Sequence, residues 1–209
     1  MAHEEPGRGG VTPGARDAMG RVDAPPLREL ARCAVRDPDA RDLLLARVRE
    51  MAVRYARVRL GRFGAEDTAQ DVAQEVCMAL VTALPTYEER GVPFEAFVYT
   101  ITARKLADAQ RSAMRAPTPV AEVPDATDDG PTPESVAVLR DDVSTALALM
   151  QTLPAQQREI LTLRVAVGMS TDETAAALGM TTGAVRVAQH RALAKLRTLL
   201  AQAGAGDVA

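Results

Sequence analysis

Residues 170–200, STDETAAALGMTTGAVRVAQHRALAKLRTLL, constrain the fold more than any other part of the chain, because they predict two helices joined by a tight turn. Ser170 and Glu173 have the spacing of a capping box, in which the hydroxyl and the carboxylate each bind a free backbone N–H at a helix start. Gly179 follows the first helix and can take the positive φ that ends it. The segment therefore predicts a helix-turn-helix motif.

The second of these helices carries a basic face. Thr181 or Thr182 can cap it, small Ala175 lets the two helices approach, and Val185 fills the angle between them. The side facing the core is expected to carry Val185, Ala192, Leu196 and Leu199, and the outer side Arg186, Gln189, His190, Arg191, Lys195 and Arg197. A basic face can be merely solvated, but residues 183–200 contain no acid at all. Together these features favour a helix that binds in the DNA major groove.

Composition predicts an all-α protein with one large domain or two small ones. The chain has 209 residues, no Trp and only six Phe plus Tyr, so its core must rely on Ala, Leu and Val. Such a mixture suits packed helices and argues against a β-sandwich. The net charge of −3 means that any DNA contact must come from local basic patches.

The two cysteines and the hydropathy pattern indicate a reducing compartment. Cys33 and Cys77 share no CxxC motif and lie in apolar helical surroundings, so both are interpreted as reduced core residues without a disulfide. No apolar run has the length of a membrane span, and the N-terminus lacks a hydrophobic signal region. We expect a cytoplasmic protein that does not bind membranes.

Apolar periodicity predicts helices over about 27–34, 38–60, 65–84 and 94–114. The third has a buried ridge of Val72, Val76, Leu80 and Leu84, and another face with Asp71, Gln74, Glu75 and Met78. That polar face with one exposed Met suits a docking surface. Its two carboxylates lack a His, a Lys or a phosphate-binding loop nearby, so no catalytic residue, metal site, cofactor or small-molecule substrate is expected.

Aromatic residues concentrate at the start of the fourth helix, where Tyr87, Phe94, Phe97 and Tyr99 fall within thirteen positions. Basic residues follow at Arg104, Lys105, Arg111 and Arg115, opposed only by Asp108. Rings that stack on bases beside cations that follow phosphates are typical of single-strand binding. For Phe94 and Phe97 inward packing is the favoured interpretation, whereas Tyr87 in the preceding loop is more open to a nucleic-acid role.

Residues 116–134, with five prolines and the acids Glu122, Asp125, Asp128 and Asp129, are predicted to form a flexible acidic linker. Its reach is about 60 Å fully extended and roughly 23 Å as a random coil. It would join helical domains at 25–115 and 135–203, with disordered tails at 1–24 and 204–209. Before the helix-turn-helix, the second domain would add one helix up to Leu153 and another from Pro154 to Gly168.

Two blocks in this order resemble the extracytoplasmic-function (ECF) type of sigma-70 family RNA polymerase sigma factor. DVAQEVCMAL and PFEAFVYTITARKLAD resemble region 2 of that family, and LPAQQREILTLRVAVGMSTDETAAALGMTTGAVRVAQHRALAKLR resembles region 4. The segment TTGAVRVAQHRAL resembles the corresponding sequence of the actinobacterial sigma-D-type group. The resemblance implies an initiation factor that binds the polymerase core, through the β and β′ subunits, and promoter DNA.

The resemblance also assigns roles to residues. Core binding falls on Asp71, Gln74, Glu75 and Met78. Recognition and melting of the −10 element fall on Tyr87 and Arg90 in the loop that captures an unpaired base, and on Arg104, Lys105, Asp108 and Arg111. Recognition of the −35 element falls on Thr182, Arg186, Val187, His190, Arg191 and Lys195. Whether an anti-sigma factor holds the chain inactive stays open.

Three positions depart from the family pattern. Phe97 stands where Trp is usual, which preserves packing. Arg104 stands where the family commonly has Asn. We therefore expect less polar recognition of bases at this position and a stronger attraction to DNA phosphates. Val187 and Ala188 replace polar or basic residues, which leaves fewer hydrogen bonds to base edges. An ordinary dimeric helix-turn-helix regulator and an enzyme carrying this motif are the alternatives, although no dimerisation helix and no nucleophile–base set is evident.

Overall fold

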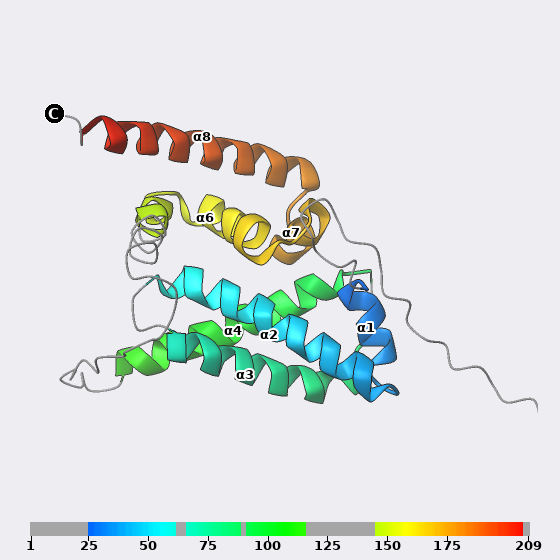
Figure 1. Cartoon of the computed structure of the whole chain (residues 1–209). Coiled ribbons are helices and arrows are strands. Elements are labelled where there is room, and N and C mark those ends of the chain that lie inside the picture. Colours follow the sequence, from blue (N-terminus) through cyan, green and yellow to red (C-terminus); the bar gives the residue numbers. More distant parts are fainter. Residues whose placement is uncertain (1–24, 62–65, 89–90, 116–144, 207–209) are drawn as a thin grey trace, which may run out of the picture.

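The computed structural model describes residues 25–61, 66–88, 91–115 and 145–206, with side chains up to residue 202, and every regular element among them is helical (Figure 1). The predicted N-terminal tail and the linker at 116–134 lie outside the described residues. The all-α prediction is confirmed.

The first half forms four α-helices and a short 3-10 turn: α1 (Leu27–Cys33), α2 (Pro38–Leu60), α3 (Glu66–Ala83), η1 (Leu84–Thr86) and α4 (Phe94–Arg115). Asp37 caps α2, because its carboxylate accepts the backbone N–H groups of Asp39 at 3.0 Å and Ala40 at 3.4 Å. Gly61 ends α2 at φ 59°, a conformation that favours glycine. The helices thus begin and end at the residues that local chemistry indicates.

The second half contains a helical stretch at 145–151, α6 (Ala155–Leu161), the π-helical turn η2 (Thr162–Val167), α7 (Thr171–Leu178) and α8 (Thr182–Gly206). The π-helical turn was not predicted, and it leaves Val165 67% exposed while Leu163 is fully buried. Helix α8 continues to Gly206, three residues into the stretch assigned to the C-terminal tail.

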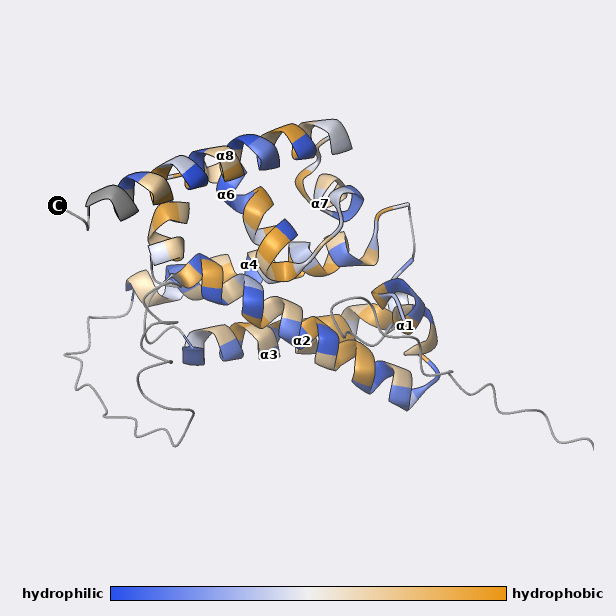
Figure 2. Cartoon of the chain, turned by 45° about the horizontal axis from the view of Figure 1, so that its top comes forward, coloured by the Kyte–Doolittle hydropathy of each residue, from blue (hydrophilic) through white to orange (hydrophobic). Residues whose placement is uncertain are grey.

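The helices lie in layers, with α6 and α7 between α8 and the pair α2 and α4 (Figure 1). Hydrophilic and hydrophobic residues interleave along α2, α3 and α8, as expected for helices that bury one face (Figure 2). One core is built by α1 to α4 together with Leu163, Val167 and Met169 of the second half. The two halves therefore pack directly on each other.

The cysteines differ in burial. Both are free thiols. Cys77 is half-buried, but Cys33 is exposed, so the prediction that it is a core residue is wrong. Cys33 occupies the last turn of α1, where Leu30 and Ala31 face inward, and the helical period turns residue 33 to solvent.

The Arg57–Glu66 ion pair is expected to contribute stability that acid removes. Its N–O distance is 2.6 Å, and it joins the end of α2 to the start of α3. Hydrogen bonds from Arg57 and Gln70 lower the pKa of Glu66 from 4.5 to about 2. Because the folded pKa is depressed, the contribution is present above about pH 4.5 and is lost as pH falls through 2. Both side chains are about half exposed, so we expect about 1 kcal/mol or less.

Urea unfolding of the wild type and of Glu66→Gln measures this contribution as a function of pH. The difference in unfolding free energy should be constant above about pH 5 and shrink toward pH 2. A difference that grew in acid would contradict the assignment.

Candidate nucleic-acid and protein interfaces

The helix-turn-helix forms as the sequence predicts. The backbone N–H of Glu173 donates to Ser170 Oγ at 3.2 Å, and that of Ser170 donates to Glu173 Oε2 at 2.7 Å, which completes the capping box. Gly179 ends α7 at φ 63°. Thr181 caps the next helix, because its Oγ1 accepts the backbone N–H of Ala184 at 3.2 Å.

The packing beneath α8 leaves its basic face in solvent. Val185 and Ile160 are fully buried and pack with Ala175, as the spacing predicted. Of the side chains proposed to read the −35 element, Thr182 is half-buried, whereas the rest are exposed: Arg186, Val187, His190, Arg191 and Lys195.

Two residues on the predicted outer side of α8 form hydrogen bonds with other parts of the same chain. Gln189 was expected on that side, but it is half-buried and accepts the Arg164 Nε–H at 3.2 Å, so this prediction is wrong. Lys195 donates to the backbone oxygen of Thr152 at 3.2 Å. Arg186, His190 and Arg191 are therefore exposed in the first three turns of α8, and Arg197 is exposed further along the helix.

The polar face of α3 is exposed along its length. Asp71, Gln74 and Glu75 are exposed, Met78 is 56% exposed, and Val81 adds 45% exposed apolar surface one turn on. The ridge beneath them is buried, as predicted: Val72, Val76, Leu80 and Leu84. An acidic patch next to exposed apolar side chains suits protein docking.

A salt bridge joins α3 to the basic face of α4. Lys105 Nζ lies 3.1 Å from Glu75 Oε2, and Arg111 pairs with Asp108 on the same helix. Arg104 is exposed, and no ion pair is formed by it among the described residues. The predicted core-binding and −10 residues are therefore adjacent on neighbouring helices, which the sequence did not indicate.

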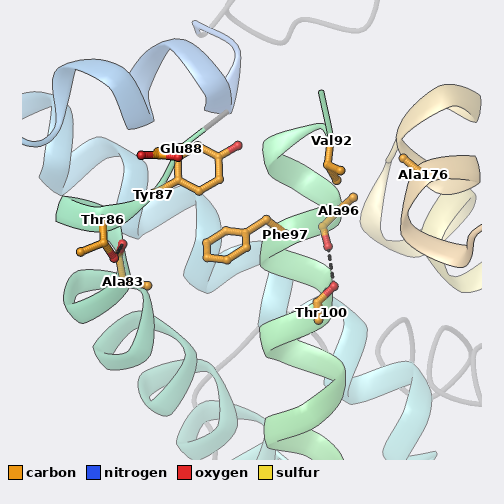
Figure 3. Close-up of a pocket in the computed structure, with 9 residues that line it drawn as sticks. All are labelled: Ala83, Thr86, Tyr87, Glu88, Val92, Ala96, Phe97, Thr100 and Ala176. Carbon is orange, nitrogen blue, oxygen red and sulfur yellow. Dashed lines mark hydrogen bonds between the residues drawn. The ribbon is translucent and has the colours of Figure 1, made fainter. Parts of the chain in front are cut away.

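Tyr87 forms one wall of a cavity of about 410 Å³ (Figure 3). Its ring centroid lies 5.1 Å from that of Phe94, edge to face, and 5.0 Å from that of Phe97. Phe94 is buried, as favoured, while Phe97 and Tyr87 are half-buried. The remaining lining residues are Ala83, Thr86, Glu88, Val92, Ala96, Thr100 and Ala176. Arg90, also predicted to contact the −10 element, lies outside the described residues.

Tyr99 belongs to a different cluster, which the sequence analysis missed. Its ring meets that of Tyr55 edge to face at 5.6 Å, and both hydroxyls donate to Glu159. Burial, together with the Glu159 carboxylate, raises the pKa of both phenols well above their ordinary value. Both therefore stay protonated donors. No local pattern could reveal this cluster, because Glu159 lies 104 residues from Tyr55 and 60 residues from Tyr99 along the chain.

Neither metal binding nor membrane insertion is indicated by the residues that the structure describes. Among them, no group of three or more His, Cys, Asp or Glu side chains could hold a metal ion. None of the described helices combines the length and the apolar character that a membrane crossing needs.

Comparison with known proteins identifies two family regions in the chain. Sigma-70 region 2 matches residues 39–116, and sigma-70 region 4 matches residues 145–196. The ECF RNA polymerase sigma factor ShbA of Streptomyces griseus is 50% identical over 172 residues, which cover 79% of this chain and 90% of that protein. The ECF RNA polymerase sigma factor SigD of Mycobacterium tuberculosis is 48% identical over 177 residues, or 84% of each protein.

A solved structure has a similar fold. CnrH, in complex with the cytosolic domain of CnrY, is 26% identical with a TM-score of 0.57, over 84% of this chain and 97% of that one.

The two regions and the relatives together define the class: the chain belongs to the ECF sigma factors of the sigma-70 family. It directs RNA polymerase to promoters, and its partners are therefore the polymerase and DNA. Like other sigma factors it is an initiation factor and not an enzyme.

Proposed function

We propose that the two regions divide the work of promoter recognition. The exposed face of α3, formed by Asp71, Gln74, Glu75 and Met78, docks on the polymerase core, through its β′ subunit. The basic face of α4 lies along the melted −10 strand. One observation supports this proposal above all: the 3.1 Å salt bridge between Glu75 and Lys105. It places a side chain proposed to contact the polymerase next to one proposed to contact DNA.

The cavity beside Tyr87 is proposed to receive an unpaired −10 base. Its walls are aromatic on one side and its volume of about 410 Å³ is sufficient for a nucleobase. Extruding a base costs a few kcal/mol of lost stacking and pairing, and stacking on Tyr87 and Phe97 offsets that cost. Arg104 and Lys105, further along α4, attract the phosphates of the same strand.

Region 4 is proposed to read the −35 duplex through α8. The exposed Arg186, His190 and Arg191 face solvent together, while Val187 contributes only apolar contact with bases. The chain acts in the cytoplasm, where core polymerase is present. Because CnrH was solved with the cytosolic domain of CnrY, an anti-sigma partner is proposed for this chain also.

Reconstituted transcription tests these assignments. The purified full chain is added to sigma-free core polymerase on a library of promoter fragments, and initiation sites are mapped. We expect initiation at a small set of fragments that share −10 and −35 sequences. Binding to DNA operators without any initiation would instead support an ordinary helix-turn-helix regulator.

Arg186→Ala is expected to weaken binding to the selected −35 duplex by about 1–3 kcal/mol, as for loss of a side chain bound to a base edge. Fluorescence anisotropy at fixed salt measures the change on that duplex and on a scrambled one. A loss confined to the selected duplex supports base recognition. An equal loss on both would make Arg186 a phosphate contact.

A further inference from the structure

A largely buried carboxylate joins the two regions across their interface. Glu159 of α6 accepts the hydroxyl of Tyr55 on α2 at 2.7 Å and that of Tyr99 on α4 at 2.9 Å, both through Oε1. Its Oε2 lies 3.5 Å from Arg59 Nη1, and its side chain is only 15% exposed. Every described partner of this carboxylate therefore comes from region 2, while Glu159 itself belongs to region 4.

Apolar packing surrounds this polar cluster. Leu163, Val167 and Met169 enter the region 2 core, and Leu178 packs against it from α7. The Arg54 Nη2 also donates to the backbone oxygen of Val167 at 3.4 Å. The interface thus combines an apolar seam with an adjacent cluster of charged and phenolic groups.

The polar groups in this seam allow the two regions to separate and reassociate. When the regions are together, the carboxylate accepts both phenol hydroxyls and pairs with the Arg59 guanidinium, whose Nε is buried without a hydrogen-bond partner. Water can satisfy all of these groups when the regions separate. A wholly apolar seam would gain its full hydrophobic free energy on closure and would resist opening. A seam that contains Glu159 and Arg59 loses part of that gain to desolvation of the charges, so the closed state is the main population but is favoured by less free energy than an apolar seam would give.

We propose that Glu159, Tyr55, Tyr99 and Arg59 form an intramolecular latch that keeps the free sigma factor closed and must open before promoter DNA is bound. Closure matters to DNA because Ala176 of α7 also lines the cavity that Tyr87 and Phe97 line (Figure 3). In the closed chain, region 4 thus forms part of the wall of the proposed base pocket. This consequence for DNA rests on the proposed function, whereas the latch itself does not.

Energy transfer between two dyes measures closure in the full chain without polymerase or DNA. Cys33 is exposed on α1, and Ala184→Cys introduces an exposed thiol at the start of α8, the end of that helix that lies on the same side of the molecule as α1 (Figure 1), in a Cys77→Ser background that leaves only these two sites. The test variants are Glu159→Gln, Glu159→Lys and the milder Tyr99→Phe, which keeps the ring. Glu29→Gln on the exposed face of α1 is the matched control.

The wild type and Glu29→Gln should give one high-transfer population. Glu159→Gln should raise the ratio of open to closed molecules about tenfold or more, because the phenols lose a charged acceptor and Arg59 loses its ion pair. Glu159→Lys should raise the ratio further by placing a cation beside Arg59. Tyr99→Phe should have a smaller effect that does not add to that of Glu159→Gln. Far-UV circular dichroism must show unchanged helix content, since an unfolded variant would also lose transfer.

Two results would overturn the latch: a wild type that already populates the low-transfer state, or a Glu159→Gln variant that behaves like Glu29→Gln. A second measurement tests the consequence for DNA, with a fluorescent single strand that carries the −10 sequence selected in the transcription assay. Opened variants should bind it at least about tenfold more tightly than the wild type. Opening without tighter strand binding would confirm that the cluster holds the regions together but refute the claim that closure blocks DNA.

Discussion

Glu75→Lys is expected to abolish association of the chain with the polymerase core while leaving its helices intact. The side chain is exposed in the middle of the α3 face, between Asp71 and Met78, so the substitution places no charge in the protein interior. If α3 docks as proposed, reversing a charge in the contact opposes two like charges and should weaken association by about 2–5 kcal/mol. Native gel shift or analytical ultracentrifugation with core polymerase measures this change.

The salt bridge between Glu75 and Lys105 supplies the control for this experiment. The double variant Glu75→Lys, Lys105→Glu restores an ion pair between α3 and α4 with its direction reversed. If Glu75 contacts the polymerase, the double variant should remain unable to associate. Recovery of association would mean that the salt bridge, and not a direct contact, is what the polymerase requires. Unchanged association of the single variant would refute the docking assignment.

Phe94→Ala is expected to lower the free energy of unfolding by about 3–5 kcal/mol, the range for removing a buried ring and leaving a cavity. The Phe94 side chain is 1% exposed at the first residue of α4. Its ring packs against Tyr87 at 5.1 Å and Phe97 at 6.0 Å between centroids. Loss of the ring should also loosen Tyr87, so binding of a −10 single strand should weaken in parallel.

Urea unfolding followed by circular dichroism measures the stability change, and the slope m shows whether the unfolded reference has changed. Met114→Ala on the same helix is the matched control, because that side chain is 86% exposed and its removal creates no cavity. A loss below about 1 kcal/mol for Phe94→Ala would contradict the packing described for the aromatic cluster.

Local signals in the sequence were sufficient to predict most helices. The capping box at Ser170, the positive φ of Gly179 and the buried ridge of α3 depend on residues within a few turns of one another, and the structure confirms all three. The resemblance to ECF sigma factors rested on two contiguous blocks, and the family comparisons confirm it. Cys33 was misjudged because an apolar neighbourhood in sequence does not say which side of a short helix a residue occupies.

The sequence by itself determined the helical class, the helix-turn-helix and the family, because periodicity, capping and turn chemistry are short-range properties of the chain. Only the tertiary structure decided that Leu163 and Met169 complete the core of the other region, that Tyr99 pairs with Tyr55, and that Glu159 lies between them. These contacts join residues far apart along the chain. Their formation depends on how preformed helices pack, and no local pattern encodes that choice.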